Sequence, residues 1–391
     1  MAESNGLLSA EEIAEIKQRA LRAISPLEPP SRGKNYRVGD KRTEAGKNLP
    51  EYYLVYFLLV ELLGFPRGGR WEKTAWSIPV DFEGNLAFVE HRKFGLGIFS
   101  PGEPDDEVVA QQIVASINRG VRTAKEFFNH LAWQAVEQSQ LNVTNTSRWL
   151  FDRYRYIYDR FREKSEEAER RKEEVITTRN EHSNGSHSTM YSRPSFQLRR
   201  EATWFGLSAI EAFFSWTEHV LVHVAVLRGN IKTGQEVADL ARQDWQIKVR
   251  AALDISSAET KSIFDDLLLI RRQIRNYMAH GAFGKHGEAF LFHSAAGAVP
   301  VMLTENERYS IWEEPMFDET FALQRAEAFI EHLWSGDLAP AKIHIQDASL
   351  PTILPYASDG TYARAMSSVG EMEDFTEYLS RRMDDAANMD F

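Results

Sequence analysis

The sequence of 391 residues contains no cysteine. Disulfide bonds, thiol nucleophiles, cysteine-bound zinc and iron–sulfur clusters are therefore excluded together. The absence of cysteine is compatible with a reducing compartment.

Long hydrophobic runs are also scarce. The most apolar stretch covers residues 52–65 and includes Glu61, so it is too short to cross a bilayer and is typical of a core element. The N-terminus is polar and acidic, unlike a secretory signal peptide. We therefore expect a cytoplasmic protein that makes no contact with a membrane.

The chain also lacks an excess of positive charge. It has 46 Lys and Arg against 57 Asp and Glu, a formal net charge of -11. A surface that binds duplex DNA everywhere is disfavoured, whereas a local basic cleft stays compatible with this balance. Hydrophobic residues make up 43% and aromatics 12%, which is enough for a true core in two modest domains or one large domain with appendages.

The first 150 residues predict a helix, a basic arm and a small α+β domain. Residues 1–50 hold the helix, capped by Ser9, and an arm that we expect to be exposed, with a nucleic-acid contact as the alternative. In residues 51–150, three stretches of alternating hydrophobicity predict strands, and a helix follows. Pro79 predicts an edge position. The loop RGGR at residues 67–70 lacks the length and the lysine of a P-loop, so no nucleotide site is predicted there.

The rest of the chain is predicted to be helical. Residues 151–197 read as a charged helix followed by a polar linker that marks a domain boundary. Residues 198–335 contain four amphipathic segments and a β-hairpin, which predict an antiparallel bundle. Residues 336–391 are predicted to form a loosely structured acidic tail. The expected fold class is mostly α, with a C-terminal antiparallel helical bundle and a small β-hairpin, preceded by a small α+β domain.

The third amphipathic segment ends in the sequence RRQIRNYMAHG, residues 271–281. Arg275 and His280 are five residues apart, and Asn276 shares a helix face with His280 because four residues separate them. Gly281 is a natural residue to follow a helix C-terminus, so His280 is expected at the helix end. Histidine is the side chain best suited to exchange protons near neutral pH. The spacing of Arg275 and His280 alone is weak evidence for a functional site. The presence of three arginines within five residues strengthens that evidence.

The segment RNYMAHG resembles the Arg-polar-x-x-x-His signature of HEPN domains (higher eukaryotes and prokaryotes nucleotide-binding). The four-helix interpretation of residues 198–335 is similar to the fold of that superfamily, with the motif near the end of the third helix. The resemblance covers about a third of the chain and does not extend to residues 1–195.

The resemblance implies a metal-independent endoribonuclease that needs no cofactor and works as a homodimer, with two copies of the motif in one cleft. It implies that His280 is the general acid or base, that Arg275 stabilises the phosphorane, and that Asn276 orients His280 or the phosphate. The products would carry a 2′,3′-cyclic phosphate and a 5′-hydroxyl, and DNA would stay intact because it lacks the 2′-hydroxyl.

Further expectations follow from the same resemblance. Arg271 and Arg272 are candidate phosphate contacts, and Tyr277 could stack on a base, although a buried core position is favoured for it. In a toxin–antitoxin branch of the family a tyrosine two residues after the histidine is modified; here that residue is Ala282, so this route of regulation is doubtful. The N-terminal 195 residues are expected to receive a regulatory partner or trigger, in phage defence, abortive infection or toxin-like regulation.

Other interpretations stay open. Arg275 could pair with Asp265, Asp266 or Glu288 while His280 caps a helix, and the chain would then be a non-catalytic helical module that dimerises and binds a nucleotide or a protein.

Two further sets of residues have side chains that could serve a functional site. His219 and His223 have the spacing of a zinc pair, but Val220 replaces the glutamate of the metalloprotease pattern, so packing is favoured. Glu211 and Glu218 could reach the cleft and orient His280, although a surface or core-edge position is favoured.

Overall fold

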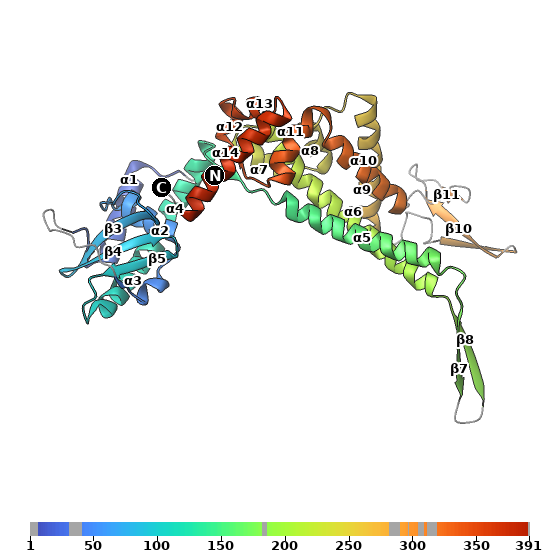
Figure 1. Cartoon of the computed structure of the whole chain (residues 1–391), viewed down its shortest axis with the longest axis horizontal. Helices are drawn as coiled ribbons and strands as arrows, with labels where there is room; N and C mark the ends of the chain where they lie inside the picture. Colours follow the sequence, from blue (N-terminus) through green and yellow to red (C-terminus); the bar gives the residue numbers. More distant parts are fainter. Residues whose placement is uncertain are drawn as a thin grey trace. The chain divides into compact units, whose positions relative to one another are not determined.

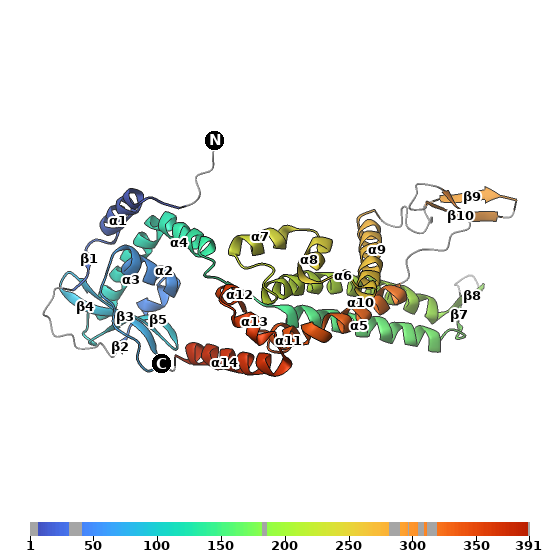
Figure 2. The same cartoon turned by 90° about the horizontal axis from the view of Figure 1, so that it is seen from above.

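The computed structural model describes residues 7–30, 41–181, 186–280, 290–295, 297–303, 309–310 and 319–389. Within these ranges the side chains of residues 273, 275–280, 290–291, 298–303 and 309–310 are left undescribed. The chain is mostly helical with a small antiparallel sheet (Figures 1 and 2). It divides into two compact units: unit 1 comprises Met1–Gln140 and Glu377–Phe391, and unit 2 comprises Leu141–Thr376.

Unit 1 is built on a five-stranded antiparallel sheet. The three long strands β3 (Thr74–Phe82), β4 (Asn85–Arg92) and β5 (Gly95–Ser100) form a meander where alternating hydrophobicity predicted it. Glu83 and Gly84 both have positive φ, which matches the tight turn that joins β3 and β4. Two short strands, β1 (Leu27–Glu28) and β2 (Lys41–Arg42), complete the order β1-β3-β4-β5-β2.

Pro79 lies where its missing N–H costs little. The strand β1 pairs only with residues 81 and 82 of β3, so the β1 side of Pro79 has no ladder partner in that sheet. The edge position predicted from the proline is therefore confirmed locally, although β3 as a whole is an inner strand.

Helices cover one face of the sheet. Ile78 and Val80 of β3 and Val89 of β4 point to the same side and belong to the buried core that unit 1 forms with its helices. Ser9 caps the first helix in a capping box with Glu12, as its sequence predicts. The helical segments are α1 (Ala10–Ile24), η1 (Ala45–Asn48), α2 (Tyr52–Tyr56), η2 (Phe57–Leu62), α3 (Asp106–Thr123) and α4 (Lys125–Glu137).

Unit 2 is organised around two long helices that lie side by side, α5 (Ser147–Arg170) and α6 (Pro194–Leu227) (Figures 1 and 2). Tyr154 and Phe161 of α5 are buried, and the Tyr154 ring lies 5.8 Å from that of Phe213 on α6. The hydroxyl of Tyr154 donates a hydrogen bond of 2.6 Å to Glu327. Although α5 is rich in charged residues, it therefore carries a row of buried aromatic side chains that packs it against the bundle.

The segment of residues 177–197, expected to be a polar linker between domains, contains regular secondary structure instead. The strands β7 (Ile176–Glu181) and β8 (His187–Ser192) form a hairpin that connects α5 to α6, and Pro194 begins α6. The boundary between the units falls after Gln140, not in this segment. The reason is the aromatic packing of α5, which places it in unit 2.

The remaining elements of the bundle follow the predicted pattern with one break. The second of the four amphipathic segments, residues 235–252, is predicted as one helix but forms two, because Asp244 has an extended backbone at the start of the second. The expected β-hairpin pairs residues 290–294 with residues 297–301 in antiparallel fashion. The elements are α7 (Gly234–Arg242), α8 (Trp245–Ala252), α9 (Ala258–His280), β9 (Phe290–Ser294), β10 (Gly297–Leu303), β11 (Tyr309–Ser310) and α10 (Glu319–Leu333).

The segment after residue 335 is folded, contrary to the expected loose tail. Leu354, Tyr362 and Met372 are buried in the core of unit 2. The strand β12 (Thr352–Ile353) pairs with β6 (Asn142–Val143). The helical segments are η3 (Gly336–Leu338), α11 (Ala339–Lys342), η4 (Ile343–Asp347), α12 (Pro355–Ser358), α13 (Thr361–Ala365) and α14 (Val369–Asn388).

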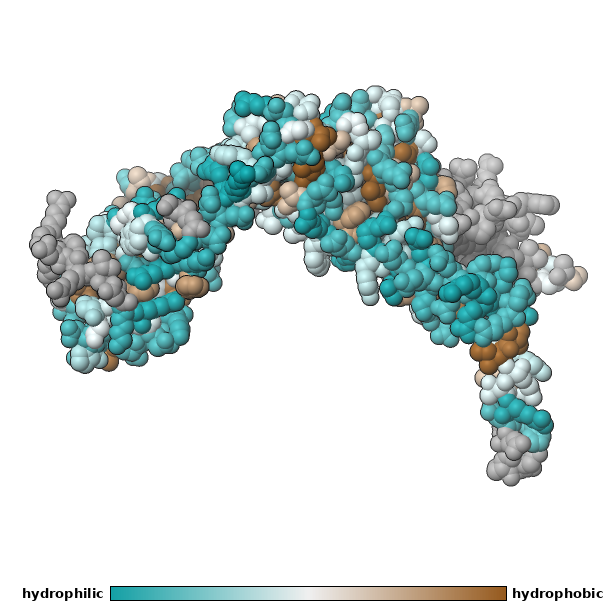
Figure 3. Space-filling model, in the orientation of Figure 1, coloured by the Kyte–Doolittle hydropathy of each residue, from teal (hydrophilic) through white to brown (hydrophobic). Residues whose placement is uncertain are grey.

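The helix α6 is long and apolar enough to cross a membrane, but 78% of its most apolar window is buried inside the protein, as in a core helix. Hydrophilic residues cover most of the face in Figure 3. A brown patch lies at the base of the β7–β8 hairpin, where Val175 and Ile176 are exposed (Figure 3).

Candidate functional site

The residues of the Arg-x4-His motif all lie in the last two turns of α9. Arg271 and Arg272 are fully described, whereas the side chains of Arg275, Asn276, Tyr277 and His280 lie outside the described part of the structure. The backbone of α9 places Arg275 one turn after Arg271, on the same face. The surroundings of Arg271 therefore show which cavity this face adjoins.

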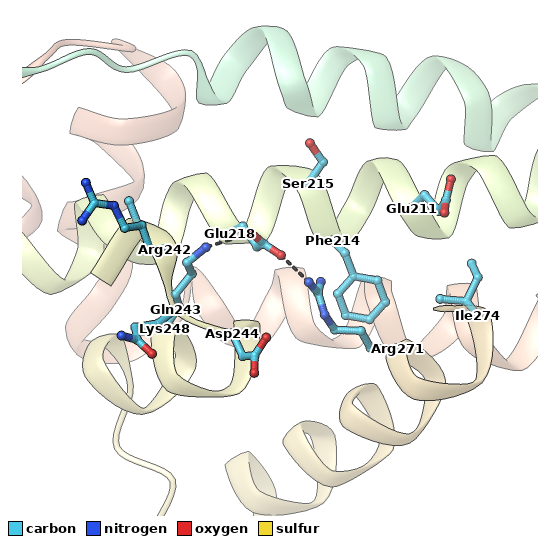
Figure 4. Close-up of a pocket in the computed structure, with 11 residues that line it drawn as sticks. Glu211, Phe214, Ser215, Glu218, Arg242, Gln243, Asp244, Lys248, Arg271 and Ile274 are labelled. Carbon is cyan, nitrogen blue, oxygen red and sulfur yellow. Dashed lines mark hydrogen bonds and ion pairs between the residues drawn. The ribbon is translucent and has the colours of Figure 1, made fainter. Parts of the chain in front are cut away.

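The side chain of Arg271 lines a hollow of about 810 Å³ in unit 2 (Figure 4). Three segments contribute to it: α6, the segment from the end of α7 into α8, and α9. The lining residues are Glu211, Phe214, Ser215, Glu218, Ala241, Arg242, Gln243, Asp244, Lys248, Arg271 and Ile274.

Glu218 links two cations in this hollow. Its carboxylate accepts a hydrogen bond of 2.8 Å from the Lys248 ammonium and a short one from the Arg271 guanidinium (Figure 4). Burial opposes ionisation of Glu218, but the hydrogen bond from Lys248 and the charges of both cations outweigh it, so its pKa lies below the ordinary value. Glu218 is therefore ionised at neutral pH.

The two cations are held differently. The side chain of Lys248 is only 5% exposed, because α8 packs on α6. That of Arg271 is 31% exposed, and its guanidinium carbon lies 5.0 Å from the centre of the Phe214 ring, within cation–π distance. Arg271 thus keeps donor groups accessible to a ligand in the hollow, whereas Lys248 chiefly compensates Glu218.

The two predicted phosphate contacts, Arg271 and Arg272, lie in different surroundings. The structure places Arg271 at the hollow, whereas Arg272 is exposed and does not line it. Glu218 reaches the hollow, as one interpretation of the sequence allowed, and its described partners are Arg271 and Lys248. Glu211 is exposed at the rim.

Sequence reasoning missed Lys248, Arg242 and Asp244. Lys248 occupies a buried position next to Val249, three residues after the buried Trp245. The signal that could have identified Lys248 is a lysine within an apolar helical pattern. A buried ammonium requires a carboxylate partner, so such a lysine indicates a buried ion pair.

The histidine pair of α6 lies apart from this hollow and is satisfied by hydrogen bonds. The Nε2 atoms of His219 and His223 are 3.1 Å apart, and Thr146 donates its N–H to His219. Nδ1 of His223 lies 2.7 Å from the hydroxyl of Thr352. Burial lowers the pKa of His223 to about 3, so the ring is neutral. These contacts agree with the packing role that the sequence favoured.

Among the residues that the structure describes, no group of three His, Asp or Glu side chains is arranged to hold a metal ion. Comparison with protein-family models, curated proteins and solved structures found no match to this chain.

Proposed function

We propose that the protein is a metal-independent endoribonuclease of HEPN type that cleaves RNA by attack of the ribose 2′-hydroxyl. The observation that carries the proposal is the position of Arg271 at a hollow of about 810 Å³, one helical turn before Arg275 on the same helix. A guanidinium beside a cavity of that size is suited to binding a phosphodiester.

The chemistry assigns one role to each residue of the motif. His280 takes the proton from the 2′-hydroxyl or gives one to the leaving 5′-oxygen, and Arg275 stabilises the charge that develops on the phosphorane. Asn276 orients His280 or the phosphate. Arg271 holds a neighbouring phosphate, with Glu218 fixing the guanidinium in place.

A homodimer fits this chemistry, because a second copy would bring another set of arginines to the same cleft. The net charge of -11 makes such local concentration of positive charge necessary for binding RNA. The proposed role is defence against phage, abortive infection or toxin-like regulation in the cytoplasm, with residues 1–195 receiving the trigger or a regulatory partner.

One observation favours a second candidate, a non-catalytic helical module that dimerises and binds a nucleotide or a protein. Glu218 already neutralises part of the charge of Arg271 and Lys248, as in a purely structural network. In that case Arg271→Ala lowers stability, and no RNA is cut by any form of the protein.

Cleavage of a pooled mixture of single-stranded and structured RNA in EDTA tests the proposal. We expect cutting by the wild type, and loss of cutting with an unchanged melting temperature in His280→Ala. His293→Ala is the matched control, because His293 is an exposed histidine on β9. If His280→Ala cuts as well as His293→Ala does, the proposed role of His280 is wrong. If no RNA is cut by the wild type, with or without a trigger, the second candidate replaces the first.

A further inference from the structure

Unit 1 has a hollow of its own beside its sheet. It measures about 320 Å³ and is lined by residues of β2, β4 and β5 and of the segment that leads from η1 into α2. A volume of this size lies at the lower end of the range for small-molecule sites. The polar and aromatic lining residues are Arg42, Lys47, Glu51, Tyr52 and His91.

The backbone beside the hollow is held in place before any ligand binds. Thr43 donates its N–H to the carbonyl of Ile98 on β5 over 2.9 Å. The carboxylate of Glu107 accepts the N–H of Glu44 over 3.0 Å. Gly46 then passes so close to β5 that a Cβ would lie 2.5 Å from the nitrogen of Ile98. The wall is therefore preformed, which reduces the entropy lost on binding.

Arg42 contributes a guanidinium that is fixed by neutral groups. It donates hydrogen bonds to the carbonyls of Phe94 and Leu96 over 3.3 and 2.8 Å. Within the described ranges of the chain, no carboxylate binds this guanidinium, so its positive charge is not neutralised by an ion pair. A guanidinium has more N–H groups than these two bonds use, and the side chain is exposed. Arg42 is therefore able to bind an anion without giving up its position.

The other charged groups of the hollow are of both signs. The ammonium of Lys47 donates a hydrogen bond of 2.6 Å to Glu44, but the two side chains are 58% and 78% exposed. Such an exposed pair contributes little, so an anionic ligand can take the place of Glu44. The carboxylate of Glu51 lines the hollow and has no hydrogen-bond partner among the residues that the structure describes. The hollow thus suits a ligand that has both an anion and a hydrogen-bond donor.

Tyr52 provides a flat apolar surface beside these charges. Its ring stacks on the imidazole of His91, with 4.2 Å between the ring centres and 9° between the planes. Burial lowers the pKa of His91, so the imidazole is neutral at pH 7. Tyr52 is nevertheless 45% exposed. The stack therefore fixes the plane of a ring that stays accessible to a second planar group.

We propose that this hollow binds a free nucleoside monophosphate whose base carries an amino group. The phosphate binds Arg42 and Lys47, because a guanidinium matches the geometry of phosphate oxygens. The base stacks on Tyr52, and its amino group donates a hydrogen bond to Glu51. The site shares no lining residue with the hollow at Arg271, so this proposal does not depend on the ribonuclease proposal.

Isothermal titration calorimetry of the full chain with guanosine monophosphate tests the proposal. We expect one saturable site. Guanosine, which lacks the phosphate, and uridine monophosphate, whose base lacks an amino group, should each bind about 10-fold more weakly or worse. Arg271→Ala should bind guanosine monophosphate as the wild type does, because Arg271 lines the hollow of unit 2.

Substitutions of Arg42 test the phosphate contact. Arg42→Ala should raise the Kd for guanosine monophosphate about 10-fold or more. Arg42→Lys keeps the charge without the planar fork, so it should raise Kd less, and it replaces Arg42→Ala if that variant fails to fold. The matched control is Arg22→Ala, because Arg22 is an exposed arginine of α1 that also donates to a backbone carbonyl.

Two further substitutions test the contacts with the base. Tyr52→Leu should weaken binding, whereas Tyr53→Leu should not, because Tyr53 is equally exposed but does not line the hollow. Glu51→Gln should reduce the preference for guanosine monophosphate over uridine monophosphate, since an amide presents donors as well as an acceptor. Glu11→Gln, at an exposed glutamate of α1, should leave that preference unchanged.

Several outcomes would overturn the proposal. They are the absence of binding, equal affinities of Arg42→Ala and Arg22→Ala, and loss of binding in Arg271→Ala alone. Competition by inorganic phosphate as strong as that by the nucleotide would contradict the contacts with the base. Equal binding of a 5′-phosphorylated oligonucleotide would contradict the choice of a free nucleotide. Failure of the ribonuclease proposal appears separately, as uncut RNA in the cleavage assay.

Discussion

Replacing Glu218 by alanine removes the carboxylate that binds both Lys248 and Arg271. Loss of one partner from a fully buried ion pair costs about 3–5 kcal/mol. Only Lys248 is buried to that degree, since the side chains of Glu218 and Arg271 are 32% and 31% exposed. Solvent therefore screens part of the loss, and we expect the free energy of unfolding to fall by about 2–3 kcal/mol at pH 7. At about 2–4 °C per kcal/mol, the melting temperature should fall by about 4–12 °C.

Thermal unfolding followed by calorimetry measures this effect. Glu211→Ala is the matched control, because Glu211 is an exposed glutamate of α6 that lines the same hollow, and we expect it to change stability by less than about 0.5 kcal/mol. Adding Lys248→Met to Glu218→Ala should restore part of the loss, since it removes the unpaired buried charge. Equal melting temperatures for Glu218→Ala and Glu211→Ala would refute this reasoning.

The contribution of Glu218 should also depend on pH. Its pKa is lowered in the folded protein, so its stabilising effect is complete above the ordinary glutamate pKa and disappears as pH falls through the folded value. The difference in stability between wild type and Glu218→Gln should therefore be constant near neutrality and shrink in acid. A difference that grows in acid would contradict the assigned direction.

Two other features of the structure give separate predictions. Burial lowers the pKa of His223 to about 3 and that of His344 to about 4. Lowering the pH from 6.5 to 5 should therefore reduce the free energy of unfolding by about 2 kcal/mol for each histidine, as measured by denaturant titration. Acid-insensitive stability over that range would show that the rings are not buried as described. Gly46→Ala should cost about 2 kcal/mol, because its Cβ would lie 2.5 Å from the backbone nitrogen of Ile98, whereas Gly69→Ala should be tolerated. Equal melting temperatures for these two variants would argue against that close approach.

Local signals in the sequence predicted local structure well. Alternating hydrophobicity located β3 and β4, and the pair Ser9 and Glu12 located the start of α1, because these patterns depend on residues close together in the chain. Charged residues dominate the composition of α5, so the sequence did not show that Phe151 and Tyr154 pack against Trp216 and Phe213 of α6.

The candidate site was only partly predictable. Arg271 was identified from its neighbours in the sequence, but its partner Glu218 lies 53 residues away on another helix, and no local pattern connects the two. The same applies to Leu354 and Tyr362, which short helical segments bring into the core from a stretch that reads as a tail. Pairings over such distances are set by the tertiary fold.

Identification of the ends of RNA products made in EDTA tests the central claim most directly. The proposed mechanism predicts a 2′,3′-cyclic phosphate on one fragment and a 5′-hydroxyl on the other, with no cutting at a nucleotide that lacks its 2′-hydroxyl. Mass spectrometry of a short RNA and of its singly 2′-deoxy-substituted analogue distinguishes these ends. Products with a 5′-phosphate, or cutting at the substituted position, would contradict the mechanism.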